Sequence, residues 1–246
     1  MNTMIIYVEG NIGSGKTTFI NLLQDYLSQF DVLNKNAKLV LEPVDEWLKT
    51  EDSDGENILQ KFYGDQEKWS FAFQMNSFIS RVKKIQDEFH NGDDKPLYND
   101  IPSESQLITN YNVMEKLVFV ERSIYTDYHC FAKLCYENGK MTKLEYDIYC
   151  KWNDWLSEQF NVKPDAYIYL RCDPTINDER IKERSRDGED GIPLDYLTAL
   201  HEKHDEWLNF EKENVPVYVV DSTQNFKKKE VMDTIFDGIF EFVKTL

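Results

Sequence analysis

The sequence predicts an α/β fold in which a parallel five-stranded sheet is covered by helices on both faces. Short apolar runs alternate with longer amphipathic stretches along the chain, and this alternation is typical of βα units. The first apolar run leads directly into Gly10–Thr17, whose glycine spacing is that of a phosphate-binding loop between a strand and a helix. Because no internal repeat or long linker divides the 246 residues, we expect a single domain over residues 1–246.

Five apolar runs are the predicted strands. They begin at about Met4 and continue at Lys38–Leu41, Leu117–Val120, Ala166–Leu170 and Val217–Val220. Apolar residues at helical spacing follow the phosphate loop, and further helices are predicted over about 64–90, 124–137, 142–160, 176–184 and 193–210 and at the C-terminus. Residues 91–112 are rich in Asn, Asp, Ser and Pro, so we interpret them as an inserted surface loop.

The composition limits the partners. The chain has 28 Lys plus Arg against 45 Asp plus Glu, a formal charge of −17. An acidic surface repels nucleic acid and anionic membranes, so neither is expected as a partner. No run of 18 apolar residues is present, which argues against a transmembrane helix. The first strand begins too early to leave room for a targeting peptide, and the four cysteines lack metal-ligand spacing, so a cytoplasmic protein with reduced thiols is expected.

The phosphate loop is the motif that carries most of the functional argument. It reads Gly10-Asn11-Ile12-Gly13-Ser14-Gly15-Lys16-Thr17-Thr18. Glycines let the main chain approach a phosphate, and the backbone N–H groups then form a nest for anions at a helix N-terminus. Lys16 would reach the β- and γ-phosphates, and the Thr17 hydroxyl would bind Mg²⁺. The motif therefore predicts ATP and Mg²⁺ as ligands.

Charged residues follow two other strands. Glu42 comes after the second strand, and Glu121-Arg122 follow the third. Ligands of such sheets bind at the carboxyl ends of the strands. A hydroxyl that attacks a γ-phosphate needs a carboxylate to accept its proton, and Glu42 is the candidate base. Arg122 is suited to orient that carboxylate, and Glu121 can hold Mg²⁺ directly or through water.

A basic cluster follows the fourth strand. Arg180, Lys182, Arg184 and Arg186 form the densest group of cations in this acidic chain. We interpret the segment of about 184–192 as a lid that closes its arginines on the transferred phosphate and excludes water. The nearby sequence His201-Glu202-Lys203-His204 has its second histidine one residue too early for a zinc helix motif, so helix packing is expected there.

One face of the long predicted helix carries polar residues. Gln74, Ser77 and Arg81 fall at positions i, i+3 and i+7, so they share a face. Arg81 on a partly apolar face needs a partner, and Asp127 is the candidate. Either the two form an ordinary structural ion pair, or they shape the far end of a substrate pocket.

Taken together, these residues resemble the deoxynucleoside kinase family over nearly the whole chain. The matching pieces include the phosphate loop, Glu42-Pro43-Val44 with Trp47, Phe73-Gln74, Glu121-Arg122-Ser123, Arg184-Ser185-Arg186 and the run Gly191–Leu197 with Leu200, His201 and His204. The Glu-Arg-Ser form is similar to the cellular branch of the family and differs from the herpesvirus thymidine kinases.

The resemblance implies roles for individual residues. Glu42 would be the general base with Arg122 as its partner, Thr17 and Glu121 would serve Mg²⁺, and the lid cations would be Arg180, Arg184 and Arg186. The nucleoside pocket that it implies places Ile12, Trp47 and Phe78 against the base, Gln74 on its edge, and Tyr63 and Glu189 at the sugar 3′-hydroxyl. Asn225 and Phe226 would border the base of the phosphate donor. A homodimer formed through long helices is also implied.

The expected activity is ATP-dependent phosphorylation of the 5′-hydroxyl of deoxynucleosides in nucleotide salvage. The family's deoxycytidine and deoxyguanosine kinases carry the Arg and Asp pair, and Ser77 is more similar to the deoxyguanosine member. Since Arg donates well to purine acceptors, we predict a preference for deoxyguanosine or deoxyadenosine. The alternatives are a deoxycytidine or broad-specificity deoxynucleoside kinase, a nucleoside monophosphate kinase, which would not need Glu42 as a base, and a catalytically silent nucleotide-binding subunit.

Overall fold

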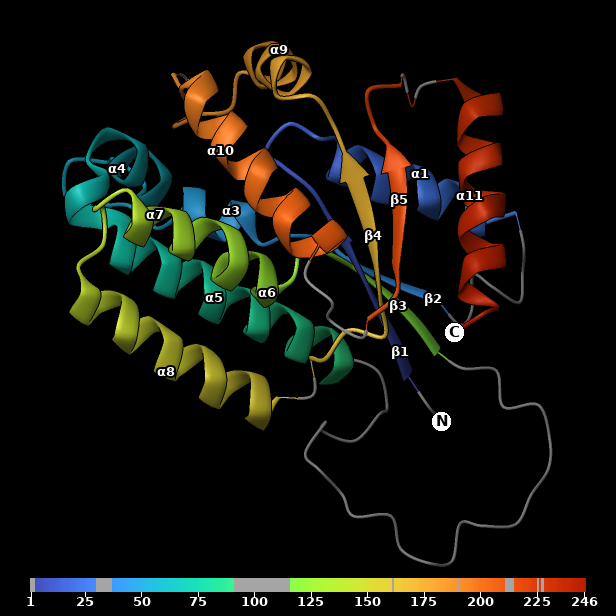
Figure 1. Cartoon of the computed structure of the whole chain (residues 1–246), viewed down its shortest axis with the longest axis horizontal. Helices are drawn as coiled ribbons and strands as arrows, with labels where there is room; N and C mark the ends of the chain where they lie inside the picture. The colour runs from blue at the N-terminus through green and yellow to red at the C-terminus, as the bar shows by residue number, and fades with distance from the viewer. Residues whose placement is uncertain are drawn as a thin grey trace, which may run out of the picture.

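A five-stranded parallel sheet forms the centre of the molecule (Figure 1). The computed structural model describes residues 3–29, 37–90, 116–160, 162–189, 191–210, 215–224, 226 and 228–246. The strands are β1 (Thr3–Glu9), β2 (Ala37–Val40), β3 (Lys116–Glu121), β4 (Ala166–Arg171) and β5 (Val217–Asp221). Their spatial order is β2-β3-β1-β4-β5. This arrangement confirms the predicted α/β fold class, whereas the predicted surface loop 91–112 lies outside the described residues.

Alternation along the strands separates two apolar cores. Ile6 and Val8 of β1 pack with α1 (Lys16–Leu27) and α11 (Lys229–Val243) on one face of the sheet. Ile5 and Tyr7 point to the other face, because successive side chains of a strand alternate. That second face is covered by the helices on the left of Figure 1, which are α5 (Gln66–His90), α8 (Lys143–Gln159) and α10 (Leu194–Asp205).

The register of the central strands aligns the residues that follow them. β1 pairs with β3 from Thr3↔Lys116 to Val8↔Glu121. The buried Glu9 carboxylate at the end of β1 accepts hydrogen bonds from the backbone N–H of Ser123, at 2.8 Å, and from the Thr126 hydroxyl. These two bonds fasten the segment after β3 beside the phosphate loop.

Two short helices lie between β2 and α5. They are α3 (Val44–Leu48) and α4 (Ile58–Gly64), which the apolar pattern did not single out. Asn57 caps α4, because its side chain accepts from the Gln60 N–H at 2.9 Å while the Gln60 side chain accepts from the Asn57 N–H at 2.8 Å. α3 and α4 therefore form a defined wall at the carboxyl end of β2.

The predicted helices 124–137 and 193–210 each contain a wider turn. The first consists of α6 (Ile124–Thr126), a π-helical stretch over Asp127–Ala132 and α7 (Lys133–Glu137). The second consists of α10 followed by a π-helical stretch over Glu206–Phe210. Such turns are rare and occur mainly at functional sites, so the first of them draws attention to Asp127.

Helix α9 follows β4 directly. α9 (Pro174–Arg184) crosses the carboxyl end of β4, at the top of Figure 1, and the Asp173 side chain caps it by accepting from the Thr175 N–H at 2.8 Å.

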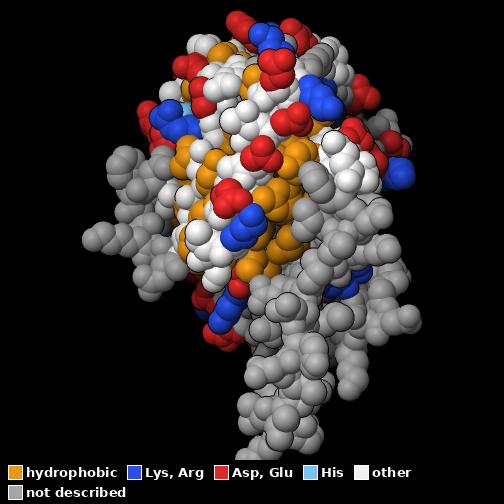
Figure 2. All heavy atoms as spheres, turned by 90° about the vertical axis from the view of Figure 1, so that its right-hand side faces the viewer, with side chains coloured by type: hydrophobic (Ala, Val, Ile, Leu, Met, Phe, Trp, Pro, Cys, Tyr) orange, Lys and Arg blue, Asp and Glu red, His pale blue; other side chains and the backbone are white. Residues whose placement is uncertain are grey.

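Figure 2 views the molecule from the side of α11 and shows acidic side chains spread over this face with an apolar strip between them. Within the described part of the chain, no helix combines the length and the apolar character that crossing a bilayer requires.

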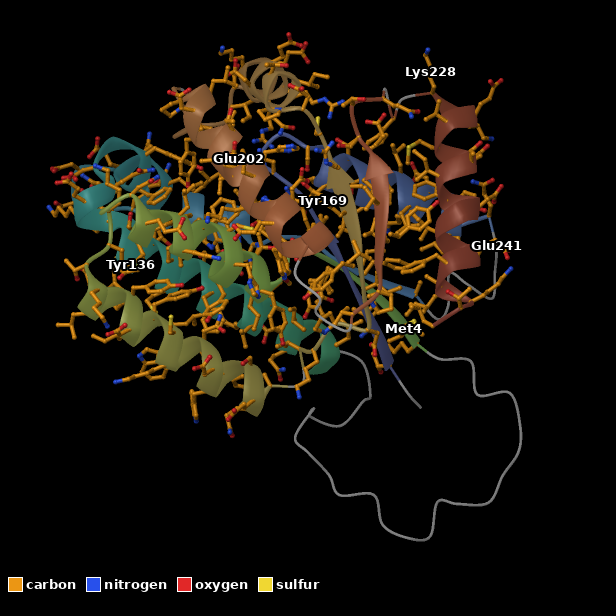
Figure 3. The ribbon with its side chains drawn as sticks, in the orientation of Figure 1. Met4, Tyr136, Tyr169, Glu202, Lys228 and Glu241 are labelled. Carbon is orange, nitrogen blue, oxygen red and sulfur yellow. The ribbon has the colours of Figure 1, made fainter. Side chains whose placement is uncertain are left out.

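Side chains fill the space between β4 and α10. Tyr169, labelled in Figure 3, lies at this junction, and its hydroxyl donates to the Asp205 carboxylate of α10 at 2.8 Å. Arg171 at the end of β4 pairs with the same carboxylate at 2.7 Å. The junction thereby holds α10 close to the strand ends at which the phosphate loop lies.

Candidate active site

The phosphate loop has the backbone geometry that its glycines predict. Gly10, Gly13 and Gly15 have φ angles of 147°, 77° and 93°, which side chains disfavour. A Cβ atom on Gly10 would lie 2.7 Å from the carbonyl oxygen of Leu170, and one on Gly13 would lie 2.5 Å from that of Asn177. The glycines are thus required by the close packing of the loop against β4 and α9 as well as by its turn.

The other residues of the loop fix its position. Asn11 donates through Nδ2 to the carbonyl of Leu197 on α10 at 2.8 Å, and its Oδ1 accepts from the N–H of Ile12. The backbone N–H of the buried Ser14 donates to the carbonyl of Asn11 at 3.2 Å. Thr18 in the first turn of α1 lines the cavity described below. The loop is therefore tied to α10 before any ligand binds.

Lys16 is folded back onto the loop. Its Nζ donates to the carbonyls of Gly10 at 3.0 Å and Asn11 at 2.8 Å, and the residue is 5% exposed. Burial, together with the nearby Arg122, lowers the pKa of Lys16 to about 7. A ligand with negative charge would favour the protonated amine, so a bound phosphate would strengthen the positive charge of this site.

A cavity of about 280 Å³ opens beside the loop. It is bounded by the loop and α1, by the segment after β2, by α3, α4 and α5, by the segment after β3 and by the residues that follow α9. The predicted site residues that line it are Ile12, Gly13, Gly15, Lys16, Thr17, Thr18, Glu42, Trp47, Tyr63, Gln74, Arg81, Glu121, Arg122, Asp127, Arg184, Arg186 and Glu189. Residues far apart in the sequence are thus brought to one cavity.

Glu42 lies between two arginines in this cavity. Its Oε1 is 3.3 Å from Nε of Arg122 and also contacts NH2 of Arg81. Burial acts to raise the pKa of Glu42, but Arg122, Arg81 and Lys16 outweigh it and lower the pKa to about 2. The carboxylate is therefore ionised and able to accept a hydrogen bond at neutral pH.

Arg122 adopts a backbone conformation that few residues other than glycine adopt. Its φ is 62°, and its NH2 donates to the carbonyl of Gly10 at 3.2 Å. The guanidinium lies 4.7 Å from the ring centre of Phe131. Such strained residues persist where the surrounding structure fixes them, commonly at functional sites, and the bonds from Glu9 to the next residues supply that constraint.

The predicted metal ligands contact one another. The Thr17 hydroxyl donates to Oε1 of Glu121 at 2.6 Å, and Oε2 of Glu121 accepts from the N–H of Glu42 at 3.3 Å. A hydroxyl and a carboxylate beside a phosphate loop are the hard oxygen ligands that Mg²⁺ prefers, with phosphate oxygens and water completing its shell. The donor set therefore fits that ion. No group of three or more His, Cys, Asp or Glu suited to a metal occurs among the described residues.

One part of the cavity, here called its inner half, combines aromatic rings with buried polar groups. It is lined by Trp47, Phe73, Gln74, Arg81 and Asp127. Trp47 donates through Nε1 to the Ser80 hydroxyl at 2.8 Å and packs edge-on against Phe73, with ring centres 5.6 Å apart. Gln74 is fully buried, and neither atom of its amide has a hydrogen-bond partner in the described part of the chain. A buried amide without partners is costly, so this half is suited to a flat, polar-edged ligand.

The predicted pair of Arg81 and Asp127 forms. NH1 of Arg81 contacts Oδ2 of Asp127, and both residues are buried. Two other predicted residues of this region do not line the cavity. The Ser77 hydroxyl donates to the carbonyl of Gln74 at 3.1 Å, and Phe78 packs against Tyr149 of α8 with ring centres 6.1 Å apart.

The lid arginines share one carboxylate. Arg184 pairs with Oε2 of Glu189, and NH1 of Arg186 lies 3.1 Å from Oε1 of the same side chain. Gly188, with φ of 85°, packs so closely on α4 that a Cβ there would lie 3.0 Å from the backbone nitrogen of Gln60. Burial raises the pKa of Tyr63, whose ring belongs to the same wall. The described lid residues 184–189 thus lie beside the cavity and against α4.

A second cavity of about 580 Å³ lies on the other side of the loop. Arg180 and Phe226 line it together with the glycines of the loop. NH1 of Arg180 lies 3.5 Å from the carbonyl of Ser14, and its NH2 lies 3.4 Å from that of Gln224. Arg180 is therefore placed beside the loop but outside the first cavity, and the predicted donor-site residue Asn225 lies outside the described residues.

Three described residues of the site have no role predicted from the sequence. Phe131 and Leu59 line the first cavity, and Glu9 fixes the segment after β3. Val44 and Phe73, which the sequence marks only as parts of family motifs, line the first cavity as well. Phe131 follows Asp127 by four residues within the π-helical stretch. Because Asp127 was predicted as the partner of Arg81, its position in the sequence could have drawn attention to Phe131. The two histidines behave as expected of packing residues, with His204 fully buried and His201 beside Arg171 and Asp205.

Comparison with known proteins identifies the family. The family model for deoxynucleoside kinases matches residues 6–244. The chain is 35% identical over 263 residues to the deoxycytidine kinase of Rattus norvegicus and 33% identical over 263 residues to that of Homo sapiens, in each case covering 98% of this chain and 91% of the relative. It is also 30% identical over 268 residues to the mitochondrial deoxyguanosine kinase of Xenopus laevis, covering 100% of this chain and 92% of the relative. The chain therefore belongs to the deoxynucleoside kinase family of phosphotransferases.

Proposed function

We propose that the protein transfers the γ-phosphoryl group of ATP to the 5′-hydroxyl of deoxynucleosides in nucleotide salvage, with deoxyguanosine or deoxyadenosine preferred. The observation that carries this proposal is the position of Glu42, an ionised carboxylate in the same cavity as the phosphate loop and held by Arg122 at 3.3 Å. A carboxylate in this position is what a neutral hydroxyl acceptor requires.

The reaction assigns a task to each group. Glu42 accepts the proton of the 5′-hydroxyl as its oxygen forms the new bond to the γ-phosphorus, and the bond from that phosphorus to ADP breaks. Lys16, Arg184 and Arg186 supply positive charge to the transferred group. Mg²⁺ held by Thr17 and Glu121 would neutralise phosphate oxygens. Lys16 now donates to two loop carbonyls. We propose that it donates instead to phosphate oxygens when ATP binds.

The nucleoside would lie between the lid and the inner half of the cavity. Trp47, Ile12 and Phe131 offer apolar surface to the base, and the unpartnered amide of Gln74 offers one donor and one acceptor to its edge. Tyr63 and Glu189 would bind the 3′-hydroxyl. In the other cavity, Arg180 and Phe226 with Asn225 would border the base of ATP.

The preference for a purine rests on Arg81. Its guanidinium lies in the inner half of the cavity, and an arginine donates well to the O6 and N7 acceptors of a purine. Deoxycytidine is the second candidate, because relatives at 33–35% identity are deoxycytidine kinases. The pair of Arg81 and Asp127 fits either base, and thymidine is expected to be poor.

A competition assay with radiolabelled ATP and all four deoxynucleosides tests the proposal. A purine deoxynucleoside is expected to give most of the labelled product, and a product dominated by deoxycytidine monophosphate would replace the purine preference by the second candidate. Arg81→Met combined with Asp127→Ala is expected to raise thymidine phosphorylation by making room for the methyl group. Thymidine as the best substrate of the wild type would overturn this account of the pocket.

We further propose a cytoplasmic homodimer formed through α5 and α8. Four large apolar side chains of α8 are exposed, namely Leu144, Ile148, Trp152 and Trp155. Their spacing of three or four residues puts them on one face of the helix, and Ile79 of the neighbouring α5 is 50% exposed. A face of this kind is typical of an interface between subunits.

A further inference from the structure

Arg81 contacts two carboxylates that have different tasks in the proposed reaction. Its NH1 pairs with Asp127 in the inner half of the cavity, whereas its NH2 pairs with Glu42, the candidate base. The guanidinium is 5% exposed and lies 5.0 Å from the ring centre of Trp47. One side chain therefore bridges the part of the cavity suited to a nucleobase and the carboxylate suited to the 5′-hydroxyl.

We propose that Arg81 is a positioning residue that couples recognition of the nucleobase to the release of Glu42. With no nucleoside bound, NH2 of Arg81 pairs with Oε1 of Glu42, the same oxygen that Nε of Arg122 contacts at 3.3 Å. A base that accepts hydrogen bonds from Arg81 draws the guanidinium off that oxygen, which then accepts from the 5′-hydroxyl. This inference rests on the proposed function, because it assigns the order in which the same residues act.

The hydrogen-bond inventory of the inner cavity supports an exchange of partners. Arginine has five N–H donors in a fixed plane. NH1 and NH2 of Arg81 are engaged by carboxylates, and its Nε has no partner among the described residues. A base edge beside the unpartnered amide of Gln74 competes with Glu42 for NH2, since the other end of the guanidinium remains anchored by Asp127. Partner exchange thus needs only a small movement of a side chain already facing the cavity.

Glu42 keeps enough positive charge after this exchange. The charged or titratable groups that face it are Lys16, Tyr63, Arg81, Glu121, Arg122 and Asp127. When Arg81 turns to the base, Arg122 and Lys16 remain beside Glu42. The carboxylate is therefore stabilised throughout, and what changes is the access of the substrate hydroxyl to its oxygen.

The coupling predicts where selectivity appears in the kinetics. A nucleoside that cannot accept from Arg81 binds through the aromatic walls while Glu42 stays paired, so its turnover is slow. A nucleoside that engages Arg81 binds and turns over rapidly. Discrimination between bases is therefore expected in kcat, whereas a residue that only contacts the base would act on KM.

A binding experiment separates this coupling from direct contact. The probe is the 5′-deoxy analogue of the best deoxynucleoside substrate, which has no 5′-hydroxyl to touch Glu42. We expect Glu42→Gln to tighten binding of this analogue by about fivefold, because the ligand no longer has to break the ion pair. In the Arg81→Met background the same Glu42→Gln change is expected to leave the affinity unaltered. Equal effects of Glu42→Gln in both backgrounds, or weaker binding beside an intact Arg81, would overturn the coupling.

A kinetic measurement gives an independent readout. Arg81→Met is expected to reduce the kcat ratio between the best substrate and thymidine, while Gln74→Ala, the matched control on the same helix face, is expected to change the KM ratio alone. A change confined to KM in Arg81→Met would also overturn the coupling. If Arg81→Met does not fold because Asp127 is left unpaired, Arg81→Met with Asp127→Ala replaces it in both experiments. Absence of any deoxynucleoside phosphorylation by the wild type would contradict the proposed function itself and is measured first.

Discussion

His204 provides a test of the packing beneath the site. The side chain is fully buried on α10, its Nδ1 lies 2.6 Å from the carbonyl of Leu200, and its Nε2 has no partner in the described part of the chain. Burial, with the nearby Arg122, lowers the pKa of His204 to about 3. The folded protein therefore keeps a neutral histidine that the unfolded chain protonates near its ordinary pKa of about 6.5.

The sign of the pH effect follows from this difference. Between pH 6.5 and 3 the unfolded state binds one more proton at this position, so the free energy of unfolding falls as the pH falls. From pH 6 to pH 4 this single site removes about 2 to 3 kcal/mol of stability. The stability that neutral His204 preserves is fully present above pH 6.5 and is lost as the pH falls toward the pKa of His204 in the folded protein.

The assay compares His204→Gln with wild type in urea denaturation at several pH values. The variant loses stability at pH 7 through altered packing, but the difference in free energy of unfolding between the two proteins is expected to shrink by about 2 to 3 kcal/mol from pH 6 to pH 4. His201→Gln, one turn away and beside Asp205, is the matched control. A difference between wild type and His204→Gln that is constant with pH would refute a buried neutral His204.

Two further predictions concern the lid and the proposed dimer. Arg184→Ala and Arg186→Ala are each expected to lower kcat by about tenfold or more with a smaller rise in the nucleoside KM, because their contacts tighten in the transition state. Steady-state kinetics measure both constants, with Lys182→Ala as the control. A change in KM alone would limit the arginines to binding. Trp152→Glu is expected to convert a dimer into monomers because it puts a charge on the exposed apolar face of α8. Sedimentation equilibrium measures the mass of the particle in solution, and a variant with the same mass as the wild type would exclude that face as the interface.

The sequence predicted the sheet and most helices because their signals are local. Each strand is a short apolar run, and the long helix from about residue 64 to residue 90 has amphipathic spacing that the structure confirms as α5. The phosphate loop was predicted for the same reason, since its glycines, lysine and threonine lie within nine residues. The pairing of Arg81 with Asp127 followed from the rule that a buried charge needs a partner.

Features that depend on tertiary packing could not be read from the sequence. Nothing in the sequence around Arg122 signals a φ of 62°, because the contacts that accompany this conformation are tertiary: its N–H donates to the carbonyl of Val8 on β1, and its NH2 donates to that of Gly10. The bridge from Arg81 to Glu42 joins helix α5 to the segment after β2, and no spacing rule connects the two. The place of Phe131 in the cavity depends on the π-helical stretch Asp127–Ala132, whose departure from the 3.6-residue period no local pattern in the sequence predicts.

Replacement of Glu42, whose side chain is 11% exposed within the cavity, is the most direct test of the proposed chemistry. Glu42→Gln keeps the size of the side chain and one acceptor oxygen but removes its ability to accept a proton. We expect this variant to bind deoxynucleoside with near wild-type affinity, because a weaker hydrogen bond to the 5′-hydroxyl offsets the gain from no longer breaking the ion pair with Arg81, while turnover falls by a factor of ~10² or more. Glu46→Gln, exposed on α3, is the control and is expected to turn over normally. Turnover by Glu42→Gln close to that of wild type would contradict the central claim that Glu42 is the general base of a deoxynucleoside kinase.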